Sequence, residues 1–245
     1  MYICTKFYLA LVVYLFFASS VRAEAIYHEK FFPNGSGPFP AVIALHTSGG
    51  FKTVGHLIQR YVDDGFAVYA PNFFVKYGIT TRSRMSTFDR FREDIENDLS
   101  EVVGLMHNEP KVEKENIFAT GFSNGGFWVG YLTGSSKVSA GVSHYGVWKA
   151  NFGREITNPY PMNYFSKSSN PILALHGDVD KIQSLNFAQE AWSEIKSRGA
   201  TINTHIYTGV GHAWDRKNHR KYIYNDFVTK DSHKRTIEFF KKFMK

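Results

Sequence analysis

One serine of the chain stands in a pattern that is typical of a catalytic nucleophile. Ser123 lies in the run Gly121–Gly126, with one glycine two residues before it and another two residues after it. The preceding segment 116–120 is apolar and predicts a strand, and the following segment 127–132 predicts a short buried helix. In a strand–turn–helix of this kind the serine Oγ is exposed at the end of the strand, and the helix N-terminus favours negative charge beside it. The short pattern is loose, so the rest of the chain must supply the other catalytic groups.

A histidine and an aspartate follow later predicted strands, where the partners of such a serine are needed. A serine hydroxyl becomes nucleophilic when a base takes its proton and a third group orients that base. His212 follows the strand predicted at 202–207 and is the candidate base. Asp180 is the candidate acid in the loop after the strand at 172–175, and Asp178 in the same loop is its rival. The chain order serine, aspartate, histidine is the order found in α/β-hydrolases.

Two alternating sequence periods predict the elements that must position these residues. Continuous apolar runs are typical of parallel strands that are covered on both faces. Apolar residues at spacings of three and four predict amphipathic helices between them, with Ser86 as N-cap of the second helix. The predicted class is therefore α/β: a single domain with a mostly parallel, doubly wound sheet, flanked by helices and without a large cap. The expected strands are 25–32, 41–45, 67–70, 116–120, 140–145, 172–175 and 202–207, and the expected helices are 54–62, 88–106, 185–195 and 237–244.

From about Pro40 to its C-terminus, the chain resembles the dienelactone hydrolase family of the α/β-hydrolase superfamily. The motifs that carry the resemblance are Ala70-Pro71-Asn72, the run around Ser123, His176-Gly177-x-x-Asp180 and Gly211-His212-Ala213-Trp214. The resemblance implies that Asp180 is the acid. It also implies an oxyanion hole made by the backbone N–H groups of Thr47 and Asn124. No cofactor is expected.

Two departures from the family pattern refine the expected activity. Family members that open dienelactones carry a cysteine nucleophile, where this chain has Ser123, and an acidic residue in the first loop, where this chain has His46. A serine depends more on its histidine base than a thiol does. We therefore expect a serine hydrolase that cleaves small carboxylic esters or lactones. A peptidase of the same superfamily, and a non-catalytic binding protein on the same scaffold, are the alternatives.

Several other side chains have both a functional and a structural interpretation. Aromatic residues near the expected site could line a substrate pocket or pack in the core; they are Phe73, Phe74, Trp148 and Trp214. The irregular segment 146–170 could shape that pocket or pack on itself. Arg82 and Arg84 could bind an anionic substrate or simply face solvent. His46, His144 and His176 fall at predicted strand ends, but their spacing matches no metal motif, so no metal site is expected.

Composition limits the other classes of function. Of the 245 residues, 43% are hydrophobic, which is enough for one sizeable core and argues against a disordered chain. The formal net charge is +7, but the basic residues are spread along the chain and form no nucleic-acid-binding motif. We therefore expect no nucleic-acid partner. Composition does not predict the oligomeric state.

The first 23 residues have the features of a secretory signal peptide. Lys6 precedes an apolar run, 7–17, and small residues precede a cleavage site after Ala23. The run is short for a membrane span, although an uncleaved membrane anchor is the competing interpretation. The expected mature domain is 24–245, secreted or periplasmic. It would contain no disulfide, because Cys4, the single cysteine, lies in the leader.

Overall fold

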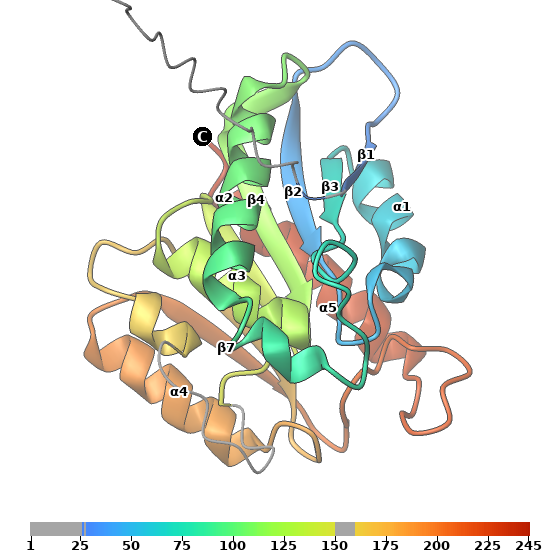
Figure 1. Ribbon diagram of the computed structural model, residues 1–245, viewed down its shortest axis with the longest axis vertical. Coiled ribbons are helices and arrows are strands. Elements are labelled where there is room, and N and C mark those ends of the chain that lie inside the picture. Colours follow the sequence, from blue (N-terminus) through green and yellow to red (C-terminus); the bar gives the residue numbers. More distant parts are fainter. Residues whose placement is uncertain (1–25, 27, 150–159) are drawn as a thin grey trace, which may run out of the picture.

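A single seven-stranded sheet organises the protein (Figure 1). The computed structural model describes Ile26 and residues 28–149 and 160–245. The strand order is β1-β3-β2-β4-β5-β6-β7, and all neighbours run parallel except β1, which pairs antiparallel with β3. The strands are β1 (His28–Phe31), β2 (Phe39–Leu45), β3 (Ala67–Pro71), β4 (Val112–Phe122), β5 (Ala140–His144), β6 (Ile172–Gly177) and β7 (Ile202–Tyr207).

Helices cover both faces of this sheet. Side chains of α2, α3 and α4 pack in one apolar core, and side chains of α1 and α5 pack in a second core. In Figure 1, α2 lies in front of the sheet and α5 behind it. The helices are α1 (Gly55–Asp63), α2 (Arg92–Asn108), α3 (Asn124–Gly134), α4 (Leu185–Ser197) and α5 (Asp226–Lys242), with single 3₁₀ turns η1 (Phe51–Thr53), η2 (Arg84–Thr87) and η3 (Pro161–Tyr164).

Strand β2 shows why the apolar runs in the sequence are continuous. Ala41, Ile43 and Leu45 face one core, whereas Val42 and Ala44 face the other. Successive side chains of a strand point to opposite faces, so a strand between two helical layers must be apolar at every position. Complete burial of one such aliphatic side chain contributes about 1.5–3 kcal/mol. The predicted doubly wound α/β fold is confirmed.

The structure corrects two predicted boundaries. Helix α2 begins at Arg92, so Ser86 is not its N-cap. Ser86 instead lies in η2, where its Oγ donates to the Ser83 carbonyl oxygen at 2.7 Å. Phe88 still points inward, with its ring 4.7 Å from that of Phe127, which explains why the apolar pattern extends beyond the helix. Helix α5 begins at Asp226, well before the predicted 237.

Other expectations fall on parts of the chain that the structure does not describe. The leader lies outside the described residues, and so does part of the irregular segment, 150–159. Among the described residues, no helix is both long enough and apolar enough to cross a bilayer.

Candidate active site

Ser123 occupies the sharp turn between β4 and α3. Its backbone has a φ of 52° and a ψ of −109°, a combination that few non-glycine residues adopt. A Cβ on Gly121 would come within 2.3 Å of the Gly125 carbonyl oxygen, and one on Gly125 within 2.2 Å of the Leu45 carbonyl oxygen. Both glycines are therefore needed to bring three backbone segments together. The N–H of Ser123 donates to the carbonyl oxygen of His144 at 3.0 Å, which fixes the turn against β5.

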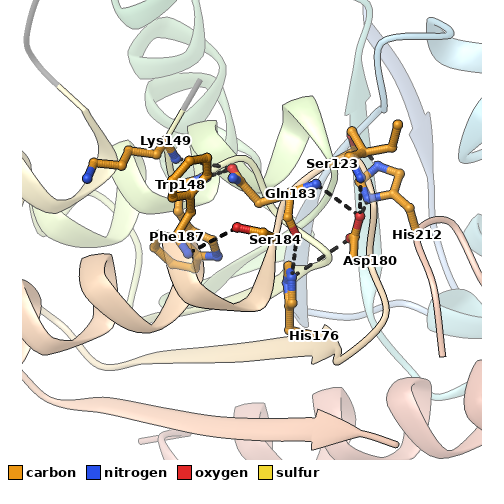
Figure 2. A network of polar contacts seen from close by, with 10 residues as sticks. Ser123, Trp148, Lys149, His176, Asp180, Gln183, Ser184, Phe187 and His212 are labelled. Atoms are coloured by element: carbon orange, nitrogen blue, oxygen red, sulfur yellow. Dashed lines mark hydrogen bonds and ion pairs between the residues drawn. The ribbon is translucent and has the colours of Figure 1, made fainter. Parts of the chain in front are cut away.

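Three side chains from three loops form one hydrogen-bonded chain at the carboxyl edge of the sheet (Figure 2). The hydroxyl of Ser123 donates to Nε2 of His212, with 2.9 Å between the two atoms. Nδ1 of His212 donates to Oδ2 of Asp180 at 2.7 Å. All three residues are buried, with only 5–7% of each exposed. This arrangement can move a proton from the hydroxyl to the imidazole while the carboxylate stabilises the resulting imidazolium.

The surroundings of Asp180 keep its carboxylate ionised. Burial acts to raise the pKa of Asp180, but the hydrogen bond and charge of His212 and the N–H of Gln183 outweigh it and hold that pKa below its ordinary value. Oδ1 accepts the backbone N–H groups of Ile182 at 2.7 Å and Gln183 at 3.0 Å. One oxygen is thus held by its own loop, which leaves the other directed at the histidine.

Asp178, the rival acid, contacts a different group. Its Oδ1 accepts the backbone N–H of Gly209 at 2.7 Å, which joins the loop after β6 to the loop after β7. The geometry therefore brings Asp180, rather than Asp178, to the imidazole of His212. The catalytic roles of these residues remain predictions.

The backbone N–H groups of the two predicted oxyanion donors differ in their hydrogen bonding. Asn124 is the first residue of α3, so its N–H belongs to the helical turn that has no intrahelical acceptor. Its side chain is held by Thr87 at 3.0 Å and by Trp128 at 3.1 Å. The N–H of Thr47 donates to Oγ1 of Thr53 at 3.1 Å, so this predicted donor already has a partner in the structure.

Gln183 was not predicted from the sequence, yet it connects the acid to the segment after β5. Its buried side-chain oxygen accepts the backbone N–H groups of Trp148 at 2.7 Å and Lys149 at 3.1 Å. Its carbonyl oxygen accepts Nε2–H of His176 at 2.9 Å, while its own N–H binds Asp180. Figure 2 shows these contacts converging on one residue. The only signal in the sequence was a polar residue three residues after the candidate acid.

Two tyrosines that the sequence analysis also missed pack against the candidate base. The ring of Tyr145 lies 4.8 Å from that of His212, and the ring of Tyr222 lies at 5.6 Å. The hydroxyl of Tyr145 donates to Oδ1 of the buried Asp215, which holds this ring in place. Burial and the nearby Asp215 carboxylate raise the pKa of Tyr145 well above its ordinary value, so the phenol stays neutral. Tyr145 directly follows β5 at the carboxyl edge of the sheet. This position after a predicted strand is the sequence feature that could have indicated a site residue.

A pocket of about 520 Å³ opens at Ser123 and His212. Its size is within the range of small-molecule sites. Four cationic side chains line it: Lys52, Arg84, Arg216 and Lys221. Among the described residues that line this pocket, none is acidic. Arg84, one of the two arginines considered for an anionic substrate, is therefore part of the pocket wall, and Arg82 is not among the lining residues.

The four aromatic residues that could have lined this pocket are core residues instead. Phe73, Phe74 and Trp148 belong to the core on one face of the sheet, and Trp214 belongs to the core on the other. None of the four exposes more than 4% of its surface, and none lines the pocket at Ser123. Of the two interpretations of these side chains, packing is the one that the structure supports.

The histidines at the strand ends are buried and separate. Burial lowers the pKa of His46 to about 4 and that of His144 to about 3, and it also lowers the pKa of His176. Within residues 28–149 and 160–245, no three histidine, cysteine, aspartate or glutamate side chains are grouped so that they could hold a metal ion.

Comparison with protein families gives a clear match. The model of the dienelactone hydrolase family matches residues 29–244, nearly the whole described chain. The chain belongs to the dienelactone hydrolase family. The fold described above is therefore that of an α/β-hydrolase, and the resemblance stated from the motifs is confirmed.

Known proteins similar to this family member include hydrolases with different substrates. The Bacillus subtilis (strain 168) protein named "Uncharacterized peptidase YtmA" is 24% identical over 209 residues, which are 73% of this chain and 79% of that protein. The dienelactone hydrolase-like promiscuous phosphotriesterase P91 from metagenomic libraries superposes with a TM-score of 0.70 at 16% identity, covering 90% of this chain and 100% of that one. Esterase 2 of Thermogutta terrifontis, phosphoramylated by tabun, gives a TM-score of 0.70 at 14% identity, covering 89% and 90%. These similarities support a hydrolase.

Proposed function

We propose that this protein is a serine hydrolase that cleaves small carboxylic esters or lactones through an acyl-enzyme. The single observation that carries the proposal is the hydrogen-bonded chain from Asp180 through His212 to Ser123, with donor–acceptor distances of 2.7 and 2.9 Å. The strained backbone of Ser123 and its position before α3 add support, because both are features of a nucleophile elbow. No cofactor takes part in the proposed reaction.

The proposed reaction has two half-reactions on one serine. Oγ of Ser123 attacks the ester carbonyl carbon while Nε2 of His212 takes the hydroxyl proton. The imidazolium, stabilised by Asp180, then gives that proton to the leaving oxygen as the carbon–oxygen bond breaks, and the alcohol departs. Water, deprotonated by the same imidazole, attacks the acyl-enzyme, and the acid is released as Oγ regains a proton. The N–H of Asn124 is the proposed first donor to the oxyanion. The predicted second donor, Thr47, can serve once its N–H is released from Thr53.

The charge of the pocket favours substrates that carry a negative charge. Four positively charged side chains line it, those of Lys52, Arg84, Arg216 and Lys221. Cationic walls of low dielectric raise the local concentration of anions. Monomethyl succinate should therefore be a better substrate than the neutral dimethyl succinate, and this preference should weaken as salt is added.

Labelling of the active site tests the proposed function. A fluorophosphonate probe should label the wild-type protein once. Ser123→Ala should abolish the labelling and lower the esterase activity by at least a thousandfold. The variant must remain folded, as judged by circular dichroism. If the variant keeps activity within tenfold of wild type, Ser123 is not the nucleophile. A folded wild-type protein that is neither labelled nor active would instead favour the non-catalytic binding protein.

A peptidase is the second candidate function, because the similar Bacillus subtilis protein carries that name. The same nucleophile, base and acid could cleave a peptide, so the choice depends on the pocket. The two candidates differ in one measurement: kcat/KM for aminoacyl p-nitroanilides compared with kcat/KM for p-nitrophenyl esters of the same acids. We expect kcat/KM for the ester to exceed kcat/KM for the amide by a larger factor than the ratio of their uncatalysed hydrolysis rates.

The proposed cellular location is the envelope or the surrounding medium. The proposal depends on the signal-peptide features of residues 1–23 and on cleavage after Ala23. If the leader is not cleaved, the domain is held at a membrane surface by its N-terminal segment. In either case the proposed substrate is a small molecule, and no nucleic-acid partner is proposed.

A further inference from the structure

A second pocket lies against the candidate base, between the loop after β6 and the loop after β7. Its volume is about 660 Å³, which is also within the range of small-molecule sites. Four aliphatic residues line it: Val179, Ile182, Val210 and Ile223. The proposed reaction leaves this pocket unexplained.

Large aliphatic side chains are exposed around this pocket. Val179 exposes 52% of its surface, Ile182 41% and Ile223 87%. Single exposed aliphatic residues are ordinary, but several around one hollow mark a surface that binds an apolar group. The pocket at Ser123 is more strongly cationic, because four cationic residues line it, whereas two, Lys181 and Lys221, line the second pocket beside its aliphatic residues. The two pockets therefore suit chemically different parts of one molecule.

The two pockets meet at the imidazole. Ile182, His212 and Tyr222 line both of them, as does Lys221. In an ester cleaved by Ser123, the oxygen that leaves must receive its proton from Nε2 of His212. The leaving oxygen therefore lies beside the imidazole, and the group attached to it continues past His212. This geometry directs the alcohol part of the substrate toward the second pocket and leaves the acyl part in the cationic pocket.

We propose that the second pocket binds the apolar alcohol part of the substrate. The substrate class is then an ester between a short, negatively charged acid and an alkyl or aryl alcohol of moderate size. This inference rests on the ester hydrolysis proposed above. Val179, Ile182 and Ile223 are its specificity-determining residues.

Two series of esters test the orientation. In the first, the acid is succinate and the alcohol grows from methyl through butyl to hexyl; in the second, the alcohol is ethyl and the acyl chain grows from acetyl to hexanoyl. Burial of each added methylene should raise kcat/KM by about two- to fourfold while the pocket fills. We expect this rise in the alcohol series and a much smaller one in the acyl series. A rise confined to the acyl series would overturn the proposed orientation.

Variants connect the effect to this pocket. Ile223→Ser and the near-isosteric Val179→Thr should each lower the hexyl-to-methyl ratio of kcat/KM by about fivefold or more. Ile206→Ser is the matched control, because Ile206 is a partly exposed isoleucine on β7 that does not line the pocket. Its hexyl-to-methyl ratio should equal that of wild type. If the hexyl-to-methyl ratio of kcat/KM in all three variants equals that of wild type, the proposal is wrong.

A binding measurement separates this inference from the proposed function. Hexyl succinate should bind the folded Ser123→Ala variant, which cannot turn it over, more tightly than methyl succinate does, and Ile223→Ser in that background should remove most of the difference. Equal affinities would overturn the alcohol pocket even if the wild-type enzyme is an active esterase. If Ile223→Ser instead dissociates a dimer seen by sedimentation and leaves the affinities unchanged, the aliphatic residues form an interface between two copies of the chain, and the proposal is wrong.

Discussion

Asp178 and Asp180 lie in one loop, but their carboxylates hold different groups. Asp180 has one oxygen on the imidazole of His212 and the other on two backbone N–H groups of its own loop. Asp178 binds the N–H of Gly209, in the loop that precedes the histidine. We therefore expect removal of the Asp180 charge to change the chemistry of the candidate base, and removal of the Asp178 charge to weaken the support of a loop.

Replacement of each aspartate by asparagine should separate these roles. Asp180→Asn should lower kcat by about a hundredfold or more near neutral pH, with little change in KM, because an amide can hold the wrong histidine tautomer. Asp178→Asn should cost about tenfold or less. Steady-state kinetics on one ester, with unfolding curves for both variants, make the comparison. If the two effects are reversed, Asp180 is not the orienting acid.

Single residues were predictable where a motif fixes their place along the chain. Ser123, Asp180 and His212 each follow a recognisable strand, so their meeting at one edge of a parallel sheet could be inferred. The hydrogen-bond partner of the Thr47 N–H could not be inferred from the sequence, because it depends on how η1 turns back over the loop after β2. The burial of Phe73 in the core likewise depends on tertiary packing that no local pattern contains.

At the scale of elements, Gln183 joins the loop after β6 to the segment after β5. Two buried or half-buried backbone N–H groups, of Trp148 and Lys149, have the side-chain oxygen of Gln183 as acceptor. An unsatisfied buried donor costs about 1–3 kcal/mol. This contact therefore stabilises the carboxyl edge of the sheet at the point where the candidate acid leaves it.

Gln183→Leu should lower the free energy of unfolding by about 2 kcal/mol, because it preserves bulk but removes the acceptor. Gln189→Leu is the matched control, since Gln189 lies on the exposed side of α4, and it should change stability by less than about 0.5 kcal/mol. Urea unfolding followed by tryptophan fluorescence measures both. Equal stabilities of Gln183→Leu and wild type would show that the two N–H groups find other acceptors.

Element types were easier to predict than element ends. Residues 88–106 carry a helical apolar pattern, but the helix proper starts at Arg92. The earlier apolar residue, Phe88, is buried by a turn that presents it to α3, and periodicity alone does not distinguish the two. The layers of the fold followed from the alternation of strand and helix patterns, because a parallel sheet needs a crossover between successive strands.

At the scale of the whole molecule, the signal peptide predicted for residues 1–23 determines where we expect the protein to be found. Expressed in a bacterium with a Sec pathway, the protein should be recovered in soluble form from the envelope or the medium, with Glu24 as its first residue. Mass spectrometry of the intact protein measures the cleavage site. Recovery of the uncleaved chain in the membrane fraction would show that the segment is an anchor.

Buried histidines should make the stability of the whole domain depend on pH. His46 and His144 are fully buried, and their folded pKa values are about 4 and about 3, below the ordinary 6.5, because burial disfavours the charged ring. Between pH 6.5 and 4 the unfolded state therefore binds more protons than the folded state. The free energy of unfolding must fall as pH is lowered through this window, and it is fully retained above pH 6.5.

The size of the effect follows from the same pKa values. At pH 5 each of these histidines should cost about 2 kcal/mol relative to pH 7.5, since one pKa unit corresponds to about 1.4 kcal/mol. His46→Phe keeps a ring that can stack on Phe73, which lies 3.9 Å from the imidazole of His46, and removes the titration. Its loss of stability between pH 7.5 and 5 should be about 2 kcal/mol smaller than that of wild type, measured by urea unfolding at both pH values. The same loss in both proteins would mean that His46 is already protonated in the folded state or that the unfolded chain does not bind the proton.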